Sequence, residues 1–372
     1  MISALDNKDV SEAAHALDAK LIALAEKAGG ATMATMKAAV VNQVNGPWVL
    51  QDVPMPKAGP HQVLVKIHAC GVCYTDALLA RGTIKLREFP MVLGHEGVGE
   101  VVALGEGVTT RKVGDRVGLP ITQRSCGRCD FCQERHVNSF VTANNCVAPV
   151  LTGINVDGGQ AEYVAADEDG TILLPDGLSY EMAAPTVCAG YTVWAALRRA
   201  NAKPGARVAV VGIGGVGHLG IQFAKTAGAH VIAVTHSPEK HALAKQLGAD
   251  DVVSNGAELR KVGGADVLLH TAPNHVPAVD AMRGLRPWAK LVLMGISAED
   301  AFPLPSYAVT AHSYEIIGSA HNGPEYLAEA LAIVARGDVK PMIEVFPKEQ
   351  VGDAYNRLLA GKLRFRAVVQ YA

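Results

Sequence analysis

The chain of 372 residues is 49% hydrophobic and 19% charged, and it carries a formal net charge of −2. This length and composition predict a globular protein of two domains. The nearly balanced charge argues against a nucleic-acid binder or a protein held on anionic membranes, and no apolar run is long enough to span a bilayer.

Residues 1–35 form an N-terminal extension with its own composition. The segment is acidic and contains no arginine, which argues against a mitochondrial presequence, and it lacks the apolar core of a secretory signal. Apolar side chains recur at helical spacing from Ala14 to Ala28, ahead of Gly29-Gly30, and so predict a short amphipathic helix. A disordered extension is the alternative.

The region over residues 36–183 is expected to fold as a β-rich domain. Strand-forming residues between glycine and proline positions predict strands at Lys37–Val41, Gln62–Ala69 and Gly97–Leu104. This pattern indicates a barrel-like domain built of short strands.

In residues 184–318 short apolar runs alternate with helical patterns. The predicted strands are Arg207–Val211, His230–Val234, Asp266–Leu269 and Lys290–Met294. Helices are predicted near Gly217–Ala227 and Pro238–Leu247. This α/β alternation is typical of a doubly wound parallel sheet. Residues 319–372 return to mixed character, with helices expected near Pro324–Arg336 and Val351–Leu359.

A glycine-rich turn follows the first strand of this α/β region. Gly212, Gly214 and Gly217, with Gly215 and Val216 between them, match the G-x-G-x-x-G fingerprint between an apolar strand and a helical pattern. Such glycines let the backbone approach the pyrophosphate of a dinucleotide at a helix N-terminus. A tight turn that binds nothing is the alternative.

The end of the next strand bears on the choice between NAD and NADP. NAD-specific sites place an acidic residue there to bind the ribose hydroxyl, but this chain has Thr235. A neutral pocket containing His236, Ser237 and Lys240 offers donors for a 2′-phosphate. We therefore expect NADP in preference to NAD.

Close Cys-x2-Cys pairs in a long chain with no secretory signal indicate metal ligands rather than disulfides, and thus a cytoplasmic protein. Cys126, Cys129 and Cys132 supply three thiolates in one loop, and Cys146 is the nearby candidate for a fourth ligand. Four thiolates predict a closed structural zinc site.

Residues 36–372 resemble the zinc-containing medium-chain alcohol dehydrogenases along nearly their whole length. The matching landmarks, in order, are Met36-Lys37-Ala38-Ala39, Gly71-Val72-Cys73 with Thr75-Asp76, Gly94-His95-Glu96, Gly114-Asp115-Arg116-Val117, the cysteine cluster, Cys188-Ala189-Gly190 and the glycine fingerprint. The resemblance implies a GroES-like catalytic domain, an inserted Rossmann domain and a C-terminal return to the catalytic domain. It also implies hydride transfer between NAD(P) and a primary alcohol or aldehyde, with two zinc ions per chain.

The resemblance also assigns roles to individual residues. It places the catalytic zinc on Cys73, His95 and Cys188, which sequence spacing alone does not join; singly, each is more often an ordinary buried residue. Further roles fall on Asp76, which orients the ligand histidine, on Glu96 behind the metal, on Thr75, which binds the substrate oxygen, and on Arg366, which contacts the cofactor pyrophosphate. A surface position is the alternative for Arg366.

The sequence departs from the family pattern at four places. Thirteen residues, rather than seven, separate Cys132 from Cys146, which puts Phe140 at the usual ligand position and implies a six-residue insertion. Leu78 replaces a relay histidine, so proton exchange is expected through Thr75, the ribose hydroxyl and water, or through a base elsewhere in the protein. Tyr74 replaces a basic residue beside the pyrophosphate. Ile84 and Ile121 map to pocket aromatics, which predicts a wider, aliphatic pocket for medium-sized or aromatic substrates.

Three other functions were weighed against this one. A polyol or formaldehyde-type zinc dehydrogenase stays open, because pocket residues do not exclude it. A zinc-free quinone reductase has no use for the three catalytic ligands, and their presence also argues against a non-enzymatic protein on this fold.

A homotetramer is expected, with a dimer as the alternative. The remaining histidines, His270, His275, His312 and His321, are expected to serve packing or surface roles.

Overall fold

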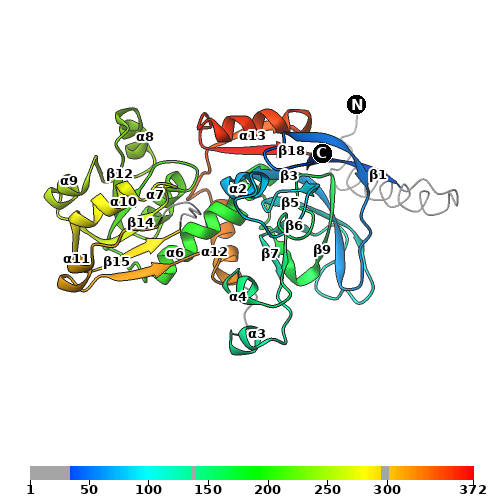
Figure 1. The fold of residues 1–372 in the computed structure, drawn as a ribbon, viewed down its shortest axis with the longest axis horizontal. Helices are drawn as coiled ribbons and strands as arrows, with labels where there is room; N and C mark the ends of the chain where they lie inside the picture. The colour runs from blue at the N-terminus through cyan, green and yellow to red at the C-terminus, as the bar shows by residue number, and fades with distance from the viewer. Residues whose placement is uncertain (1–33, 136–139, 295–300) are drawn as a thin grey trace, which may run out of the picture.

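The structure is a computed structural model that describes residues 34–135, 140–294 and 301–372. The predicted N-terminal helix lies outside these residues. Figure 1 shows the six-stranded sheet and its helices on the left and a β-rich region on the right, with helices α6 (Tyr191–Arg199) and α12 (Pro324–Ala335) between them.

The β-rich region is organised around strand β3, Gln62–Val72, which is buried along most of its length. β3 pairs antiparallel with three strands, β5 (Gly97–Leu104), β9 (Tyr163–Asp167) and β18 (Arg366–Gln370). Its sheet has the order β10-β6-β5-β3-β18-β17. The strands not yet named are β10 (Ile172–Leu173), β6 (Arg116–Leu119) and β17 (Ile343–Pro347).

Two smaller sheets complete this region. One has the order β2-β1-β4 and is made of Trp48–Pro54, Thr35–Val41 and Met91–Val92. The other joins β7 (Thr122–Arg124) to β8 (Val150–Leu151), and the excursion between these two strands carries the short helices α3 (Asp130–Arg135) and α4 (Phe140–Asn145). Figure 1 shows this excursion projecting from the body of the molecule.

The other sheet is parallel throughout and has the strand order β13-β12-β11-β14-β15-β16. Its strands are Asp251–Val253, His230–Val234, Arg207–Val211, Ala265–His270, Leu285–Leu293 and Glu315–Gly318. Helices α7 (Gly217–Thr226), α8 (His241–Gln246), α9 (Gly256–Lys261), α10 (Val276–Ala281) and α11 (Ser306–Ala311) connect the strands. The order reverses between β11 and β14, where doubly wound folds bind their ligands.

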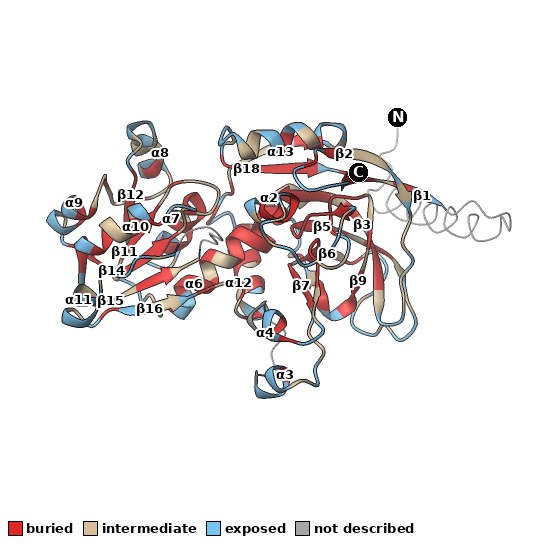
Figure 2. Ribbon diagram, in the orientation of Figure 1, coloured by how far each residue is buried: buried red, intermediate tan, exposed pale blue. Residues whose placement is uncertain are grey.

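The central strands β11 and β12 are almost wholly buried, as Figure 2 shows, because helices cover both faces of the sheet. This explains why their sequences are continuous apolar runs. Both strands have the bounds that the sequence predicts. β15 begins at Leu285 rather than Lys290. Leu285 pairs with Ala265 of β14, and Lys290 pairs with Val267, so a register irregularity lets β15 pair with β14 before its apolar run begins.

After β16 the chain returns to the first region through α12, β17, α13 (Val351–Leu359) and β18. β18 lies between β3 and β17, so a late segment completes the sheet of an early one. None of the helices in the described ranges combines the length and the hydropathy that a bilayer crossing requires.

Candidate active site and metal centres

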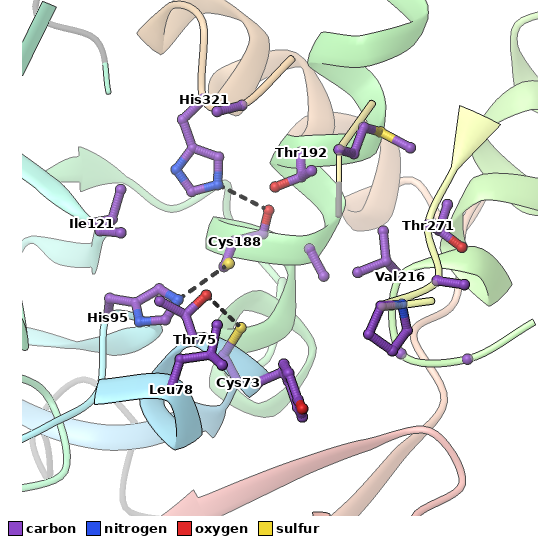
Figure 3. A pocket seen from close by; sticks show the side chains of 18 of the residues that line it. Cys73, Thr75, Leu78, His95, Ile121, Cys188, Thr192, Val216, Thr271 and His321 are labelled. Atoms are coloured by element: carbon purple, nitrogen blue, oxygen red, sulfur yellow. Dashed lines mark hydrogen bonds between the residues drawn. The ribbon is translucent and has the colours of Figure 1, made fainter. Parts of the chain in front are cut away.

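Three chain segments bring Cys73, His95 and Cys188 together. Cys73 caps helix α2 (Tyr74–Ala80), His95 lies between β4 and β5, and Cys188 lies in a π-helical turn, Thr186–Gly190. Their ligand atoms and a carboxylate oxygen of Glu96 all lie within 4.8 Å of one another. Figure 3 shows Cys188 Sγ directed at His95 Nε2, 3.3 Å away. The π-helical turn is a common device at functional sites.

The fully buried carboxylate of Asp76 holds two of these groups in place. Its Oδ1 accepts a hydrogen bond from His95 Nδ1 at 3.0 Å, and its Oδ2 accepts one from the backbone N–H of Cys73 at 3.0 Å. Because Nδ1 donates to Asp76, the lone pair of Nε2 faces the two thiols. This is the arrangement that fixes a ligand histidine in metal sites.

Glu96 and Arg366 form a buried ion pair behind the cluster. Burial raises the pKa of Glu96 to about 7, against the opposing effect of Arg366. A β-carbon on Gly71 would lie 1.9 Å from Glu96 Oε2, so only glycine leaves room for this carboxylate. The guanidinium also reaches the glycine turn, where a β-carbon on Gly215 would lie 3.3 Å from Arg366 Nη1.

The donor chemistry of this cluster fits zinc. Two thiols and an imidazole are the protein ligands of an open catalytic zinc site. Cys188 donates a hydrogen bond to Cys73, and this lowers the pKa of the Cys73 thiol well below its ordinary value, which favours the thiolate that metals bind. Glu96 Oε2 is buried with no hydrogen-bond partner among the described residues, so a cation beside it would satisfy an otherwise costly group.

The projecting excursion gathers the other four cysteines, Cys126, Cys129, Cys132 and Cys146, with their sulfur atoms within 4.8 Å of one another. The backbone N–H groups of Cys126 and Ala148 donate to Cys146 Sγ at 3.2 and 3.4 Å. Backbone N–H groups of Arg128 and Cys129 lower the pKa of the Cys126 thiol to about 6. Four sulfurs with such donors fit a closed tetrahedral zinc site, and Cys146 occupies the fourth position despite the longer spacing.

The glycine turn has the conformation that a dinucleotide site needs. Gly212 has φ of +89°, and a β-carbon on Gly217 would lie 1.7 Å from the carbonyl oxygen of Gly212. Gly212, Gly214, Gly215 and Val216 line a cavity of about 740 Å³ that extends to Cys73, His95 and Cys188. The cavity therefore joins the glycine turn to the three-ligand cluster.

The residues expected to choose between NAD and NADP follow β12. Lys240 lines the cavity, whereas Thr235, His236 and Ser237 do not. Thr235 is buried and its hydroxyl accepts a hydrogen bond from the backbone N–H of Ser237 at 3.3 Å, while His236 is exposed. Of the four, Lys240 is the group that the structure places at the site.

The walls beside the three-ligand cluster are mainly aliphatic. Both Ile84 and Ile121 line the cavity, as do Leu78, Leu86, Leu151, Ile154, Leu293, Met294 and Leu358. Thr75 also lines it and lies 3.8 Å from Cys73 Sγ, measured from Thr75 Oγ1. Tyr74, the replacement for a basic residue, is partly exposed at the same cavity.

Thr192 and His321 are among the lining residues that the sequence analysis did not identify. Thr192 lies four residues after Cys188, a helical spacing that could have revealed it. His321 was expected in a packing or surface role, but its ring is buried at the cavity wall beside Cys188 (Figure 3). No sequence motif surrounds His321, so only the fold brings it to the site.

The chain matches two protein-family models, the alcohol dehydrogenase GroES-like domain over residues 59–176 and the zinc-binding dehydrogenase over residues 215–336. It is 41% identical to an alcohol dehydrogenase from Geobacillus stearothermophilus over 90% of this chain and 99% of the relative. It is 32% identical to an NADP-dependent alcohol dehydrogenase of Mycolicibacterium smegmatis over 91% and 99% of the two chains. Among solved structures, a cinnamyl alcohol dehydrogenase from Sorghum bicolor matches with a TM-score of 0.82 at 29% identity, over 91% and 98% of the chains.

Proposed function

We propose that Cys73, His95 and Cys188 hold the catalytic zinc of this protein. The chain belongs to the family of zinc-containing medium-chain alcohol dehydrogenases. As a member of that family the chain is an NAD(P)-dependent alcohol dehydrogenase/aldehyde reductase with GroES-like and Rossmann-type parts. The observation that carries the zinc assignment is the convergence of two thiols and an imidazole on one point at the end of an apolar cavity.

When bound, zinc supplies Lewis acidity toward the substrate oxygen, and the nicotinamide supplies or accepts the hydride. The chain's own residues orient these partners. Asp76 fixes the imidazole of His95, and Arg366, whose guanidinium lies beside the glycine turn, would bind the pyrophosphate. Thr75 Oγ1 accepts the hydroxyl proton of an alcohol as it releases its own proton, and the exchange runs in reverse when an aldehyde takes up the hydride and becomes an alcohol. Leu78 cannot take part in this transfer, so the proton would pass from Thr75 through the ribose hydroxyl of the cofactor and water.

The preferred cofactor in this proposal is NADP. Thr235 at the end of β12 offers no carboxylate to bind a ribose 2′-hydroxyl, and Lys240 contributes a positive charge to the cavity lining. The relative from M. smegmatis carries the name NADP-dependent, which agrees with this assignment. His236 and Ser237 are then secondary donors at the same strand end.

The preferred substrates are primary alcohols or aldehydes of medium size or with an aromatic ring. The support for this lies in Ile84 and Ile121, whose aliphatic side chains leave a wide, apolar space near the three-ligand cluster. Ethanol would fill little of that space and would lose binding free energy, roughly 1–3 kcal/mol for each unfilled contact of methylene size.

A second zinc is proposed on Cys126, Cys129, Cys132 and Cys146, which would give two ions per chain. The domain limits proposed are residues 36–183 and 319–372 for the catalytic domain and 184–318 for the Rossmann domain. The assembly proposed is a homotetramer, with a dimer as the alternative, and the location proposed is the cytoplasm, because thiols reserved for metal belong in a reducing compartment.

The test is an assay of purified enzyme with benzaldehyde and a series of aliphatic aldehydes, using NADPH and NADH in parallel, before and after zinc chelation. We expect chelator-sensitive reduction that favours NADPH and the larger aldehydes. Turnover mainly with NADH would overturn the cofactor preference alone. Full activity after complete zinc removal, verified by metal analysis, would overturn the zinc assignment and favour a zinc-free reductase.

A further inference from the structure

His321 and Tyr191 form a stacked pair beside the catalytic cluster. Their ring centroids lie 4.2 Å apart at an interplanar angle of 19°. His321 Nε2 donates to the carbonyl oxygen of Cys188 at 3.2 Å, and the hydroxyl of Tyr191 accepts the backbone N–H of Gly323 at 3.1 Å. Both side chains are buried. Each ring is therefore held by its stacking partner and by a backbone hydrogen bond.

A second, small cavity lies behind this pair. It has a volume of about 40 Å³, and His321 lines both it and the large cavity, whereas Tyr191 lines the small one alone. We call this small cavity the rear chamber. Since space of this size accommodates about one or two water molecules, it is too small to receive a substrate by itself.

The segment that joins β6 to β7 also lies between the two cavities. Ile121 lines the large cavity, while Pro120 and Thr122 line the rear chamber. Consecutive residues of this segment therefore line different cavities. The hydroxyl of Thr122 is buried without a hydrogen-bond partner among the described residues, and Asp169 and Thr171 add further polar lining. The rear chamber is thus lined by both polar and apolar side chains, whereas the walls of the large cavity are mainly aliphatic.

We propose that the His321–Tyr191 stack is the wall that sets the depth of the substrate pocket and so limits the length of the alcohol or aldehyde that binds. The proposal rests on the substrate site proposed above and identifies the residues that determine length specificity there. A substrate whose chain points away from the zinc ligands toward β7 meets the ring of His321, which Tyr191 supports from behind. Removing the imidazole joins the rear chamber to the pocket.

The test compares wild type with His321→Ala on straight-chain primary alcohols of increasing length and on α,ω-diols of the same lengths. We expect the ratio of kcat/KM for long over short alcohols to rise about tenfold in the variant. The increase should be larger for diols, because the hydroxyl of Thr122 can bind the distal hydroxyl. The affinities of straight-chain alkyl carboxamides, measured by calorimetry, should shift in the same direction, independently of turnover.

His321→Phe is the matched control, because it keeps the stacked ring and loses only the hydrogen bond to Cys188. Its length profile should match wild type. In the His321→Ala background, Thr122→Ile should return the profile to that of wild type by filling the chamber. If His321→Ala does not fold, His321→Val supplies the same test with a smaller opening.

An unchanged length profile in the Ala and Val variants would overturn the proposal, as would an equal shift in His321→Phe or a shift that Thr122→Ile does not cancel. These results are separate from a failure of the proposed function. That failure would appear in the wild type, as an absence of turnover with every alcohol and aldehyde.

Discussion

The two cysteine clusters of this protein are built in opposite ways. In the projecting excursion, four ligands come from one short stretch, residues 126–146, and backbone N–H groups support them. In the cleft, by which we mean the large cavity and the cluster at its end, Cys73, His95 and Cys188 come from three segments far apart in the chain. The buried carboxylates of Asp76 and Glu96 lie beside them. The first site needs only a loop to form, whereas the second needs the whole fold.

This difference indicates a structural role for the excursion cluster and a catalytic role for the cleft cluster. A metal held by four thiolates leaves no position for a substrate, so a zinc ion bound in the excursion would serve only to hold the loop together. The cleft set offers two thiols and an imidazole and opens on the large cavity, and carboxylates beside such groups would tune a bound metal. Variants of the two clusters should therefore fail in different ways.

The largest effect is expected from Cys188→Ala in the cleft. Loss of one ligand should remove the zinc and lower kcat/KM by at least about 1,000-fold, which corresponds to several kcal/mol of transition-state stabilisation. Activity and zinc content per chain are the measurements. The matched control is Cys70→Ala, because Cys70 is also fully buried but belongs to neither cluster. A Cys188→Ala enzyme with near-normal activity would contradict the zinc assignment.

The second-largest effect is expected from Cys132→Ala in the excursion, which should lower the free energy of unfolding rather than the activity. Loss of a structural metal site belongs to the changes that cost about 4 kcal/mol or more in the free energy of unfolding. Denaturant unfolding measures this cost, while kcat per cleft zinc should stay close to that of wild type. If kcat per cleft zinc fell as far as in Cys188→Ala, the separation of roles would be wrong.

Asp76→Asn should have an intermediate effect that has no counterpart in the excursion. The amide keeps the shape of the side chain but removes the charge that faces His95 Nδ1. Loss of such a partner typically costs about 10–100-fold in metal affinity. Competition with a chromogenic chelator should show weaker binding of one zinc and unchanged binding of the other. Equal weakening of both ions would indicate a general loss of folding.

Lys240→Ala should give the smallest effect and leave both zinc ions in place. Loss of a charged hydrogen bond to a 2′-phosphate should raise the KM for NADPH about tenfold or more, with little change for NADH. Lys245→Ala is the matched control, because Lys245 follows in the next helix and does not line the cavity. Equal changes for NADPH and NADH would show that Lys240 does not recognise the phosphate.

The same contrast explains how much the sequence could predict. Local signals were sufficient for strands β11 and β12, for the glycine turn and for the grouping of Cys126, Cys129 and Cys132, because neighbours in the chain decide them. The dispersed cleft set could be assembled only through the family resemblance, since no spacing rule joins residues 73, 95 and 188.

Features that depend on tertiary contacts were missed or misplaced. The start of β15 is set by a bulge opposite β14, which the apolar run does not contain. His321 reaches the pocket because the chain after β16 passes beside the π-helical turn, where Cys188 accepts its hydrogen bond. A lone histidine between alanine and asparagine gives no sign of this position.

The insertion of β18 between β3 and β17 has a consequence for how the molecule comes apart. The chain crosses between its two halves once before β11 and again after β16. After a protease cuts at either crossing, each fragment still has a strand that pairs with a strand of the other fragment. A single cut therefore does not release a separate half. Cuts at both crossings are needed to free the parallel sheet, and even then the remaining pieces stay joined through the ladder between β3 and β18.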